Sequence, residues 1–190
     1  MQPAPDDFLE AAEPGGSGPL SPYWPANFGF HLSWPRGSAF GNLERSARRD
    51  PDRPAIYYYG ATITYGELLS DVAALAGYLQ NRCGVRRGDR VMVDMQNSPQ
   101  YVIAFHAILR ADAVVVPVNP MNLVGELDFL AADSGARVAL IGDELAERFA
   151  ELAPGCFDHV IVARYADAAP SSSAPLLPDV DAIDDLSESL

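Results

Sequence analysis

The sequence contains no lysine, because all 13 of its basic residues are arginine. A mechanism that needs a lysine as nucleophile, Schiff base or phosphate clamp therefore cannot be supplied by these 190 residues. Cysteine is also scarce: Cys83 and Cys156 are too few for a disulfide framework and lack the spacing of a metal site. We expect each of them to be a partly buried free thiol.

Several patterns that mark common active sites are missing as well. Neither GxGxxG nor GxxxxGK[ST] occurs, so a self-contained nucleotide site of either common kind is not expected. No GxSxG elbow surrounds a serine, which argues against a hydrolase triad. The three histidines are far apart and lack metal-ligand spacing. We expect His106 to be a half-buried histidine whose polar atoms have hydrogen-bond partners.

Long apolar runs are absent too. No uninterrupted run approaches the roughly 18 residues that span a bilayer, so we expect no membrane span. The first 16 residues carry four acids and no base, which is the wrong charge for a signal or transit peptide. An apolar content of 48% is typical of a globular protein. We therefore expect a cytoplasmic location.

The net charge of −13 is unevenly distributed. Residues 36–164 hold all 13 arginines and 16 of the 26 acids, whereas the charged residues of the two ends are all acidic. The middle of the chain is therefore nearly neutral. Because no basic stripe exists to displace counterions, we do not expect a nucleic-acid partner.

Composition divides the chain into three parts. Residues 1–37 are rich in Pro, Gly and aromatic residues and are expected to form an extended arm lying across the domain. Residues 38–165 carry the periodic apolar pattern of a folded domain. Residues 166–190 combine Pro, Ser and unpaired acids and are expected to be an acidic linker or tail.

The apolar period of the middle part switches repeatedly between helix and strand. It predicts helices over residues 38–49, 65–83, 98–110, 122–133 and 143–152, and strands over 55–59, 61–64, 90–95, 113–118, 137–141 and 159–163. The first two strands form a small hairpin around Gly60. The fold class is therefore α/β: a layered, largely parallel sheet flanked by helices, with right-handed crossovers.

Three local features refine this prediction. The apolar run AVVVPV (113–118) is expected to be a strand covered on both faces that stops at Pro117. The helix over 98–110 is expected to direct Tyr101, Val102, Phe105, Ile108 and Leu109 inward. An acidic set on residues 143–152 is expected to be a solvated helix face with Arg148 between the acids. The set comprises Asp143, Glu144, Glu147 and Glu151.

The stretch ITYGEL (63–68) has the form of a capping box. Thr64 can accept a hydrogen bond from the backbone of Glu67, whose carboxylate can reach back to the Thr64 amide. Such a box is worth about 1 kcal/mol and needs no functional explanation. The residues alone thus predict an α/β domain without a complete active site.

Two motifs nevertheless resemble those of a known family. ITYGEL is similar to the first core motif of the adenylate-forming superfamily, through Thr64, Tyr65, Glu67 and Leu68. ILRADAVVVPVNP (108–120) resembles the second motif, in which a buried strand runs into Pro-x-Asn-Pro, here Pro117, Asn119 and Pro120. The order of the surrounding segments over residues 38–165 also fits. The segments NSPQ and VVVPVNPMN are most similar to the corresponding segments of the medium- and long-chain fatty-acid–CoA ligases.

The resemblance also has departures. The second motif usually reads Lys/Arg-Ala-Gly, whereas this chain has Arg110-Ala111-Asp112, which we interpret as a branch variation. The family's Ser/Thr/Gly-rich phosphate loop and its essential C-terminal lysine have no counterpart here. The resemblance thus implies the first subdomain of the large N-terminal domain.

The resemblance implies a function that this chain serves only in part. The parent reaction joins a carboxylate to AMP and then to CoA, using ATP, Mg²⁺ and CoA. We expect this chain to be scaffold, inactive alone and without a cofactor of its own, with the remainder of the ligase as partner and a homodimer as a further possibility. In some relatives an arginine near the place of Arg148 meets the CoA nucleotide, so Arg148 is a candidate for the CoA phosphate.

Two alternatives remain open. The chain could be a free-standing interaction module derived from that subdomain, which would bind a partner through the surface that the ligase normally covers. It could also be an unrelated Rossmann-like nucleotide binder, although the missing glycine loop argues against this. A fragment cut from a larger domain is expected to expose an apolar face, and therefore to dimerise or to be poorly soluble.

Overall fold

The computed structural model describes residues 37–152 and 154–168. The expected N-terminal arm and most of the expected acidic tail lie outside these residues. The described elements follow one another as α1 (Ala39–Arg49), β1 (Pro54–Tyr58), β2 (Ala61–Thr64), α2 (Tyr65–Asn81), β3 (Arg90–Asp94), α3 (Pro99–Arg110), β4 (Val114–Val118), α4 (Val124–Ser134), β5 (Val138–Gly142), η2 (Asp143–Leu145), α5 (Ala146–Ala150), β6 (His159–Ala163) and η3 (Tyr165–Ala168).

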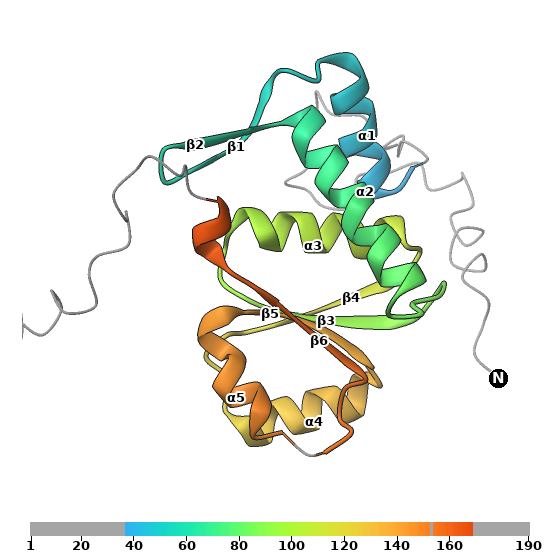
Figure 1. Ribbon diagram of the computed structural model, residues 1–190. Coiled ribbons are helices and arrows are strands. Elements are labelled where there is room, and N and C mark those ends of the chain that lie inside the picture. The colour runs from blue at the N-terminus through green and yellow to red at the C-terminus, as the bar shows by residue number, and fades with distance from the viewer. Residues whose placement is uncertain (1–36, 153, 169–190) are drawn as a thin grey trace, which may run out of the picture. The chain divides into compact units, whose positions relative to one another are not determined.

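Four of the strands form a parallel sheet in the order β4-β3-β5-β6, which confirms the predicted α/β class. From β3 the chain passes through α3 to β4, which lies on one side of β3. From β4 it passes through α4 to β5, which lies on the other side of β3. Figure 1 shows α3 on one face of this sheet and α4 and α5 on the other. Crossovers of one hand that run in opposite directions place their helices on opposite faces in this way.

The core follows the two-residue period of the strands. Val91 and Val93 of β3 belong to the cluster packed beneath α2 and α3, whereas Met92 between them belongs to the cluster beneath α4. In β5, Ala139 and Ile141 pack on the α4 side. A strand buried on both faces cannot alternate apolar with polar residues, which explains the continuous apolar runs in the sequence.

The hairpin β1–β2 forms a separate antiparallel pair beside α2. It leads directly into α2 through the capping box: Glu67 N donates to Thr64 Oγ1 (3.2 Å), and Thr64 N donates to Glu67 Oε2 (2.8 Å). Both hydrogen bonds of the predicted box are therefore present. The expected free cysteines are also found, each half-buried.

The strand β4 differs from the prediction. It continues through Pro117, which is aligned with Val93, and ends at Val118. It is an outer strand of the sheet. Both of its faces are covered in part, since Ala113 and Val115 belong to the core on one side and Val116 and Val118 to the core on the other, while Val114 and Pro117 are exposed. Proline is tolerated here because the nitrogen that lacks a hydrogen can face the free edge of an outer strand.

Two helices also differ from the prediction. In α3, Ile108 is buried as expected, and the half-buried Tyr101 and Val102 pack against the same core. Phe105 and Leu109 are half-buried and belong to neither core cluster, and the other buried positions are Pro99, Ala104 and Ala107. Small alanines line the buried face because α2 and the sheet approach α3 closely. The single helix expected over 143–152 is instead a 3₁₀ turn, η2, followed by the short helix α5.

His106 is half-buried as expected, but its buried Nδ1 atom has no hydrogen-bond partner in the part of the chain that the structure describes, where the expectation of satisfied polar atoms was therefore wrong. Burial lowers the pKa of this imidazole, because the charged form loses hydration. The ring lies edge-on to Phe105 with centroids 5.5 Å apart. The His106 ring is therefore neutral and makes an aromatic contact.

The departure at Asp112 has a backbone explanation. Asp112 follows α3 with a φ of 57°, in the left-handed region where the family usually has glycine. Its carbonyl accepts a hydrogen bond from Gly88 N (2.8 Å), which ties this turn to the turn before β3. Aspartate is one of the few residues that tolerates this conformation, so the substitution leaves the turn in place.

Candidate functional site

The carboxyl ends of β3 and β5 are the place in this fold where a site is expected. The two strands are neighbours, but the chain leaves β3 toward α3 on one face and leaves β5 toward α5 on the other. In open α/β sheets a crevice forms at such a switch point, and ligands bind there. Strand β3 ends in Asp94 and β5 ends in Gly142.

Asp94 is a charged side chain enclosed in this edge. The residue is 0% exposed, and neither carboxylate oxygen has a hydrogen-bond partner among residues 37–152 and 154–168. Burial raises the pKa of Asp94 to about 6; the positive charge of Arg148 opposes this rise, and the negative charge of Glu144 adds to it. A fully buried, unpaired carboxylate is costly unless a positive charge lies near it.

Tyr165 joins three segments at the same edge. Its hydroxyl accepts a hydrogen bond from Gln96 N (2.8 Å) and donates one to Glu144 Oε1 (2.9 Å). Burial is the main cause that raises the pKa of Tyr165, and the adjacent Glu144 raises it further. Gln100 supports this arrangement by donating from Nε2 to the Arg164 carbonyl (2.8 Å). Thus η3 is fastened to the start of α3.

Gly142 makes this arrangement possible. A Cβ atom at this position would collide with the Tyr165 hydroxyl and the Glu144 carboxylate. Its φ of −69° is open to any residue, so glycine is needed for space and not for conformation.

Arg148 lies on α5, with its guanidinium turned toward the loop between β4 and α4. Its Nη1 donates to the carbonyl oxygens of Pro120 (2.6 Å) and Asn122 (2.8 Å). The four acids around it in sequence are all exposed, as expected for a solvated face. Arg148 itself is half-buried and differs from them. The proposed contact with a CoA phosphate stays a prediction.

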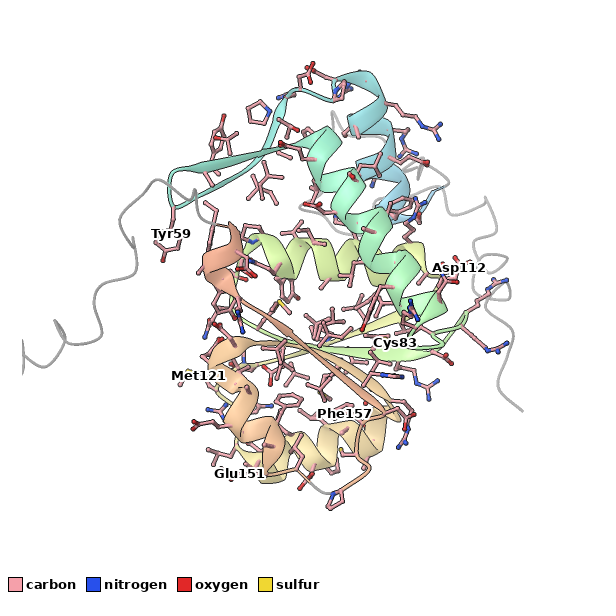
Figure 2. All side chains as sticks on the ribbon, viewed as in Figure 1. Tyr59, Cys83, Asp112, Met121, Glu151 and Phe157 are labelled. Atoms are coloured by element: carbon pink, nitrogen blue, oxygen red, sulfur yellow. The ribbon has the colours of Figure 1, made fainter. Side chains whose placement is uncertain are left out.

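The family motifs lie in two different places. In the second motif, Asn119 Oδ1 accepts from Met121 N (3.0 Å) and closes a tight turn after Pro117. In the first motif, Leu68 is buried in the core and Tyr65 packs against it. Figure 2 shows Met121 and Asp112 at opposite ends of the sheet, so the strand of the second motif runs from the left-handed turn to the carboxyl edge.

A separate hollow of about 780 Å³ lies beside the start of α2. Glu67 of the first motif lines it together with Asp71, Ser70 and Gln100, but no residue of the second motif does. Burial and the neighbouring Glu67 raise the pKa of Asp71. The structure therefore brings the two motifs into one domain but not into one pocket.

Sequence reasoning missed Asp94 and Tyr165 at the carboxyl edge. The signal for Asp94 was present, since RVMVD ends an otherwise apolar strand on a charged residue. Tyr165 carried no such signal, because its partners are 69 and 21 residues away in the sequence. In residues 37–152 and 154–168 no three His, Cys, Asp or Glu side chains are grouped to hold a metal ion. No helix of that part is long and apolar enough to cross a membrane.

The fold defines a class: a doubly wound α/β segment with a parallel sheet. A sequence profile described as AMP-binding enzyme matches residues 43–186, and the chain belongs to this family. It is similar to the long-chain-fatty-acid–CoA ligase of Bacillus subtilis (strain 168), with 35% identity over 122 residues. It is also similar to the feruloyl-CoA synthase of an Amycolatopsis species, with 44% identity over 111 residues.

These alignments cover 64% and 58% of this chain, but the chain spans only 22% of the length of either relative. Among solved structures, the inhibitor-bound N-terminal domain of FACL13 from Mycobacterium tuberculosis matches with a TM-score of 0.60 and 26% identity, over 68% of this chain and 33% of that one. The N-terminal subdomain of Klebsiella oxytoca NpsA, in complex with 3-hydroxyanthranilyl-AMSN, matches with a TM-score of 0.54 and 30% identity, over 65% and 28%.

Proposed function

We propose that this chain is the N-terminal segment of an ATP-dependent, AMP-forming fatty-acid–CoA ligase, in which it serves as scaffold. The parent reaction activates a carboxylate as an acyl-adenylate and transfers the acyl group to CoA, with ATP, Mg²⁺ and CoA as its small molecules. The observation that carries the proposal is the 35% identity to a fatty-acid–CoA ligase, confined to about a fifth of that enzyme.

The scaffold role is supported by what the described residues do. The residues of the first motif form a helix cap and core contacts, and those of the second shape an edge strand and a tight turn. The 190 residues include no lysine and no glycine-rich phosphate loop. We therefore assign catalysis to the part of the ligase that this chain does not contain.

The first test is turnover. The chain is mixed with ATP, Mg²⁺ and a long-chain fatty acid, and pyrophosphate release is measured against a heat-denatured sample of the same chain. We expect no difference between the two samples. Release above the denatured control would contradict the scaffold role.

The second test is complementation. The ligase of Bacillus subtilis is expressed without the region that aligns with this chain, and the chain is added to it. We expect pyrophosphate release to depend on the added chain and to saturate with its concentration. A chain that folds but never restores release, at any concentration that remains soluble, would contradict the assignment and favour a separate interaction module.

A further inference from the structure

Three segments meet on the α4 and α5 side of the carboxyl edge: the end of β3, the helix α5 and the loop between β4 and α4. Asp94 follows Met92 by two residues along β3, so both side chains point to this face. Arg148 reaches the loop from α5 and supplies the positive charge that acts on Asp94.

The hydrogen bonds of Arg148 are directed at the loop backbone. One nitrogen, Nη1, donates to the carbonyls of Pro120 and Asn122, at 2.6 and 2.8 Å. Both are half-buried contacts across 28 and 26 residues of sequence. Hydrogen bonds from a charged donor are stronger than neutral ones. This contact therefore restrains the backbone at Pro120 and Asn122, which belong to no strand or helix.

Asp94 lies on the same side of the sheet and is fully buried, and its oxygens have no hydrogen-bond partner among the described residues. The charge of Arg148 opposes the rise in the pKa of Asp94, whereas Glu144 on η2, which is exposed and bonded to Tyr165, adds to that rise. The direct contacts of Arg148 are therefore its hydrogen bonds to the loop.

The loop that Arg148 contacts carries two of the most exposed apolar side chains in the described part of the chain. Met121 is 77% exposed and Leu123 is 69% exposed. Met121 N donates to Asn119 Oδ1 (3.0 Å) and Asn122 N donates to Asn119 O (2.9 Å), while Leu123, the N-cap of α4, donates from N to Glu126 Oε2 (2.8 Å). The short turn between Asn119 and Leu123, with Met121 pointing outward, would open readily without an anchor outside it.

We propose that Arg148 is a positioning residue that fixes the loop Asn119–Leu123 at the carboxyl edge of the sheet, through its hydrogen bonds to the carbonyls of Pro120 and Asn122. Arg148 thereby holds Met121 outward in one conformation. That the fixed loop meets the remainder of a ligase rests on the proposed function.

The test is amide hydrogen exchange of this chain, read at Met121 and Asn122. Arg148→Met keeps the length of the side chain and removes its donors. We expect exchange at these two amides to rise at least tenfold, while amides in β3 and β5 keep their rates. The matched control is Arg137→Met. Arg137 also donates to loop carbonyls, those of Gly155 (2.9 Å) and Cys156 (3.5 Å), but it is exposed and bonded to Asp158. This control should leave Met121 and Asn122 unchanged.

Two further variants keep the proposal testable if Arg148→Met fails to fold. Arg148→Lys retains a charged donor and should give exchange rates between those of the wild type and Arg148→Met. Asp94→Asn has the same shape without the charge and should change loop exchange less than Arg148→Met does, because the hydrogen bonds of Arg148 to the loop remain.

The proposal is overturned if Arg148→Met leaves loop exchange unchanged, or raises it equally in β3 and β5, which would indicate only general destabilisation. These outcomes are independent of pyrophosphate release. A failed anchor therefore leaves the ligase assignment standing, and a failed complementation leaves the anchor standing.

Discussion

At the scale of single residues, Asp94 gives the molecule a definite pH response. Its folded pKa of about 6 lies above the ordinary value of 3.8, so the native state binds the proton more tightly than the unfolded chain does. The stabilisation from that proton is complete below the unfolded pKa and is lost as the pH rises through 6. At neutral pH the ionised Asp94 thus lowers the free energy of unfolding. The charge of Arg148 reduces this loss, and the charge of Glu144 increases it.

Asp94→Asn removes this titration, and we expect its stability relative to wild type to improve as the pH rises. Between about pH 5 and pH 7.5 the difference in unfolding free energy should shift by roughly 1.5 kcal/mol in favour of the variant. Urea denaturation of both proteins at several pH values measures it. Comparing the two proteins cancels His106, whose lowered pKa acts in the opposite direction. A difference that is flat across this range would contradict the burial of an ionisable Asp94.

Residues such as these mark the limit of what the sequence could predict. The charge at the end of β3 was visible, but the charged groups that act on it, Arg148 and Glu144, lie about 50 residues further along the chain. Arg148 stood among acids in the sequence, yet its hydrogen bonds go to backbone carbonyls of another loop. Side-chain partners at such separations are set by tertiary packing, which a local pattern does not contain.

At the scale of elements, the capping box of α2 is a predicted feature with a measurable value. Thr64→Ala removes the acceptor for Glu67 N and should lower the unfolding free energy by about 1 kcal/mol. Thr64→Ser keeps a hydroxyl in the same place and should lose only a few tenths of a kcal/mol. Chemical denaturation compares the two. Equal losses in both variants would indicate that packing of the threonine methyl group, and not the cap, provides the stability.

Elements were predicted well where a period and a terminator agreed. The helix α3 begins at Pro99 after the N-cap Ser98, and β6 spans His159–Ala163 as expected. Prediction was wrong where the position of an element in the sheet decided the outcome. Pro117 reads as a strand end only if the strand is central, and nothing in the run AVVVPV reveals that β4 is an outer strand.

At the scale of the whole molecule, exposed apolar side chains favour self-association. On the outer strand β6, Val160 and Val162 are 44% and 47% exposed, on the face opposite Ile161. We expect the apparent mass in sedimentation to rise with concentration, and the double variant Val160→Thr/Val162→Thr to weaken this rise. Val114→Thr, on the other outer strand, is the control and should have little effect. A monomer at all concentrations in the wild type would contradict the prediction.

Pro117 has a consequence for how this sheet can be extended. An added strand must find a row of backbone donors and acceptors, and the proline interrupts that row along β4. The sequence of β6, HVIVA, has no such interruption. The sheet therefore has a direction of growth: a further strand, whether from a continuing polypeptide or from a second molecule, has a complete template at β6 and an incomplete one at β4.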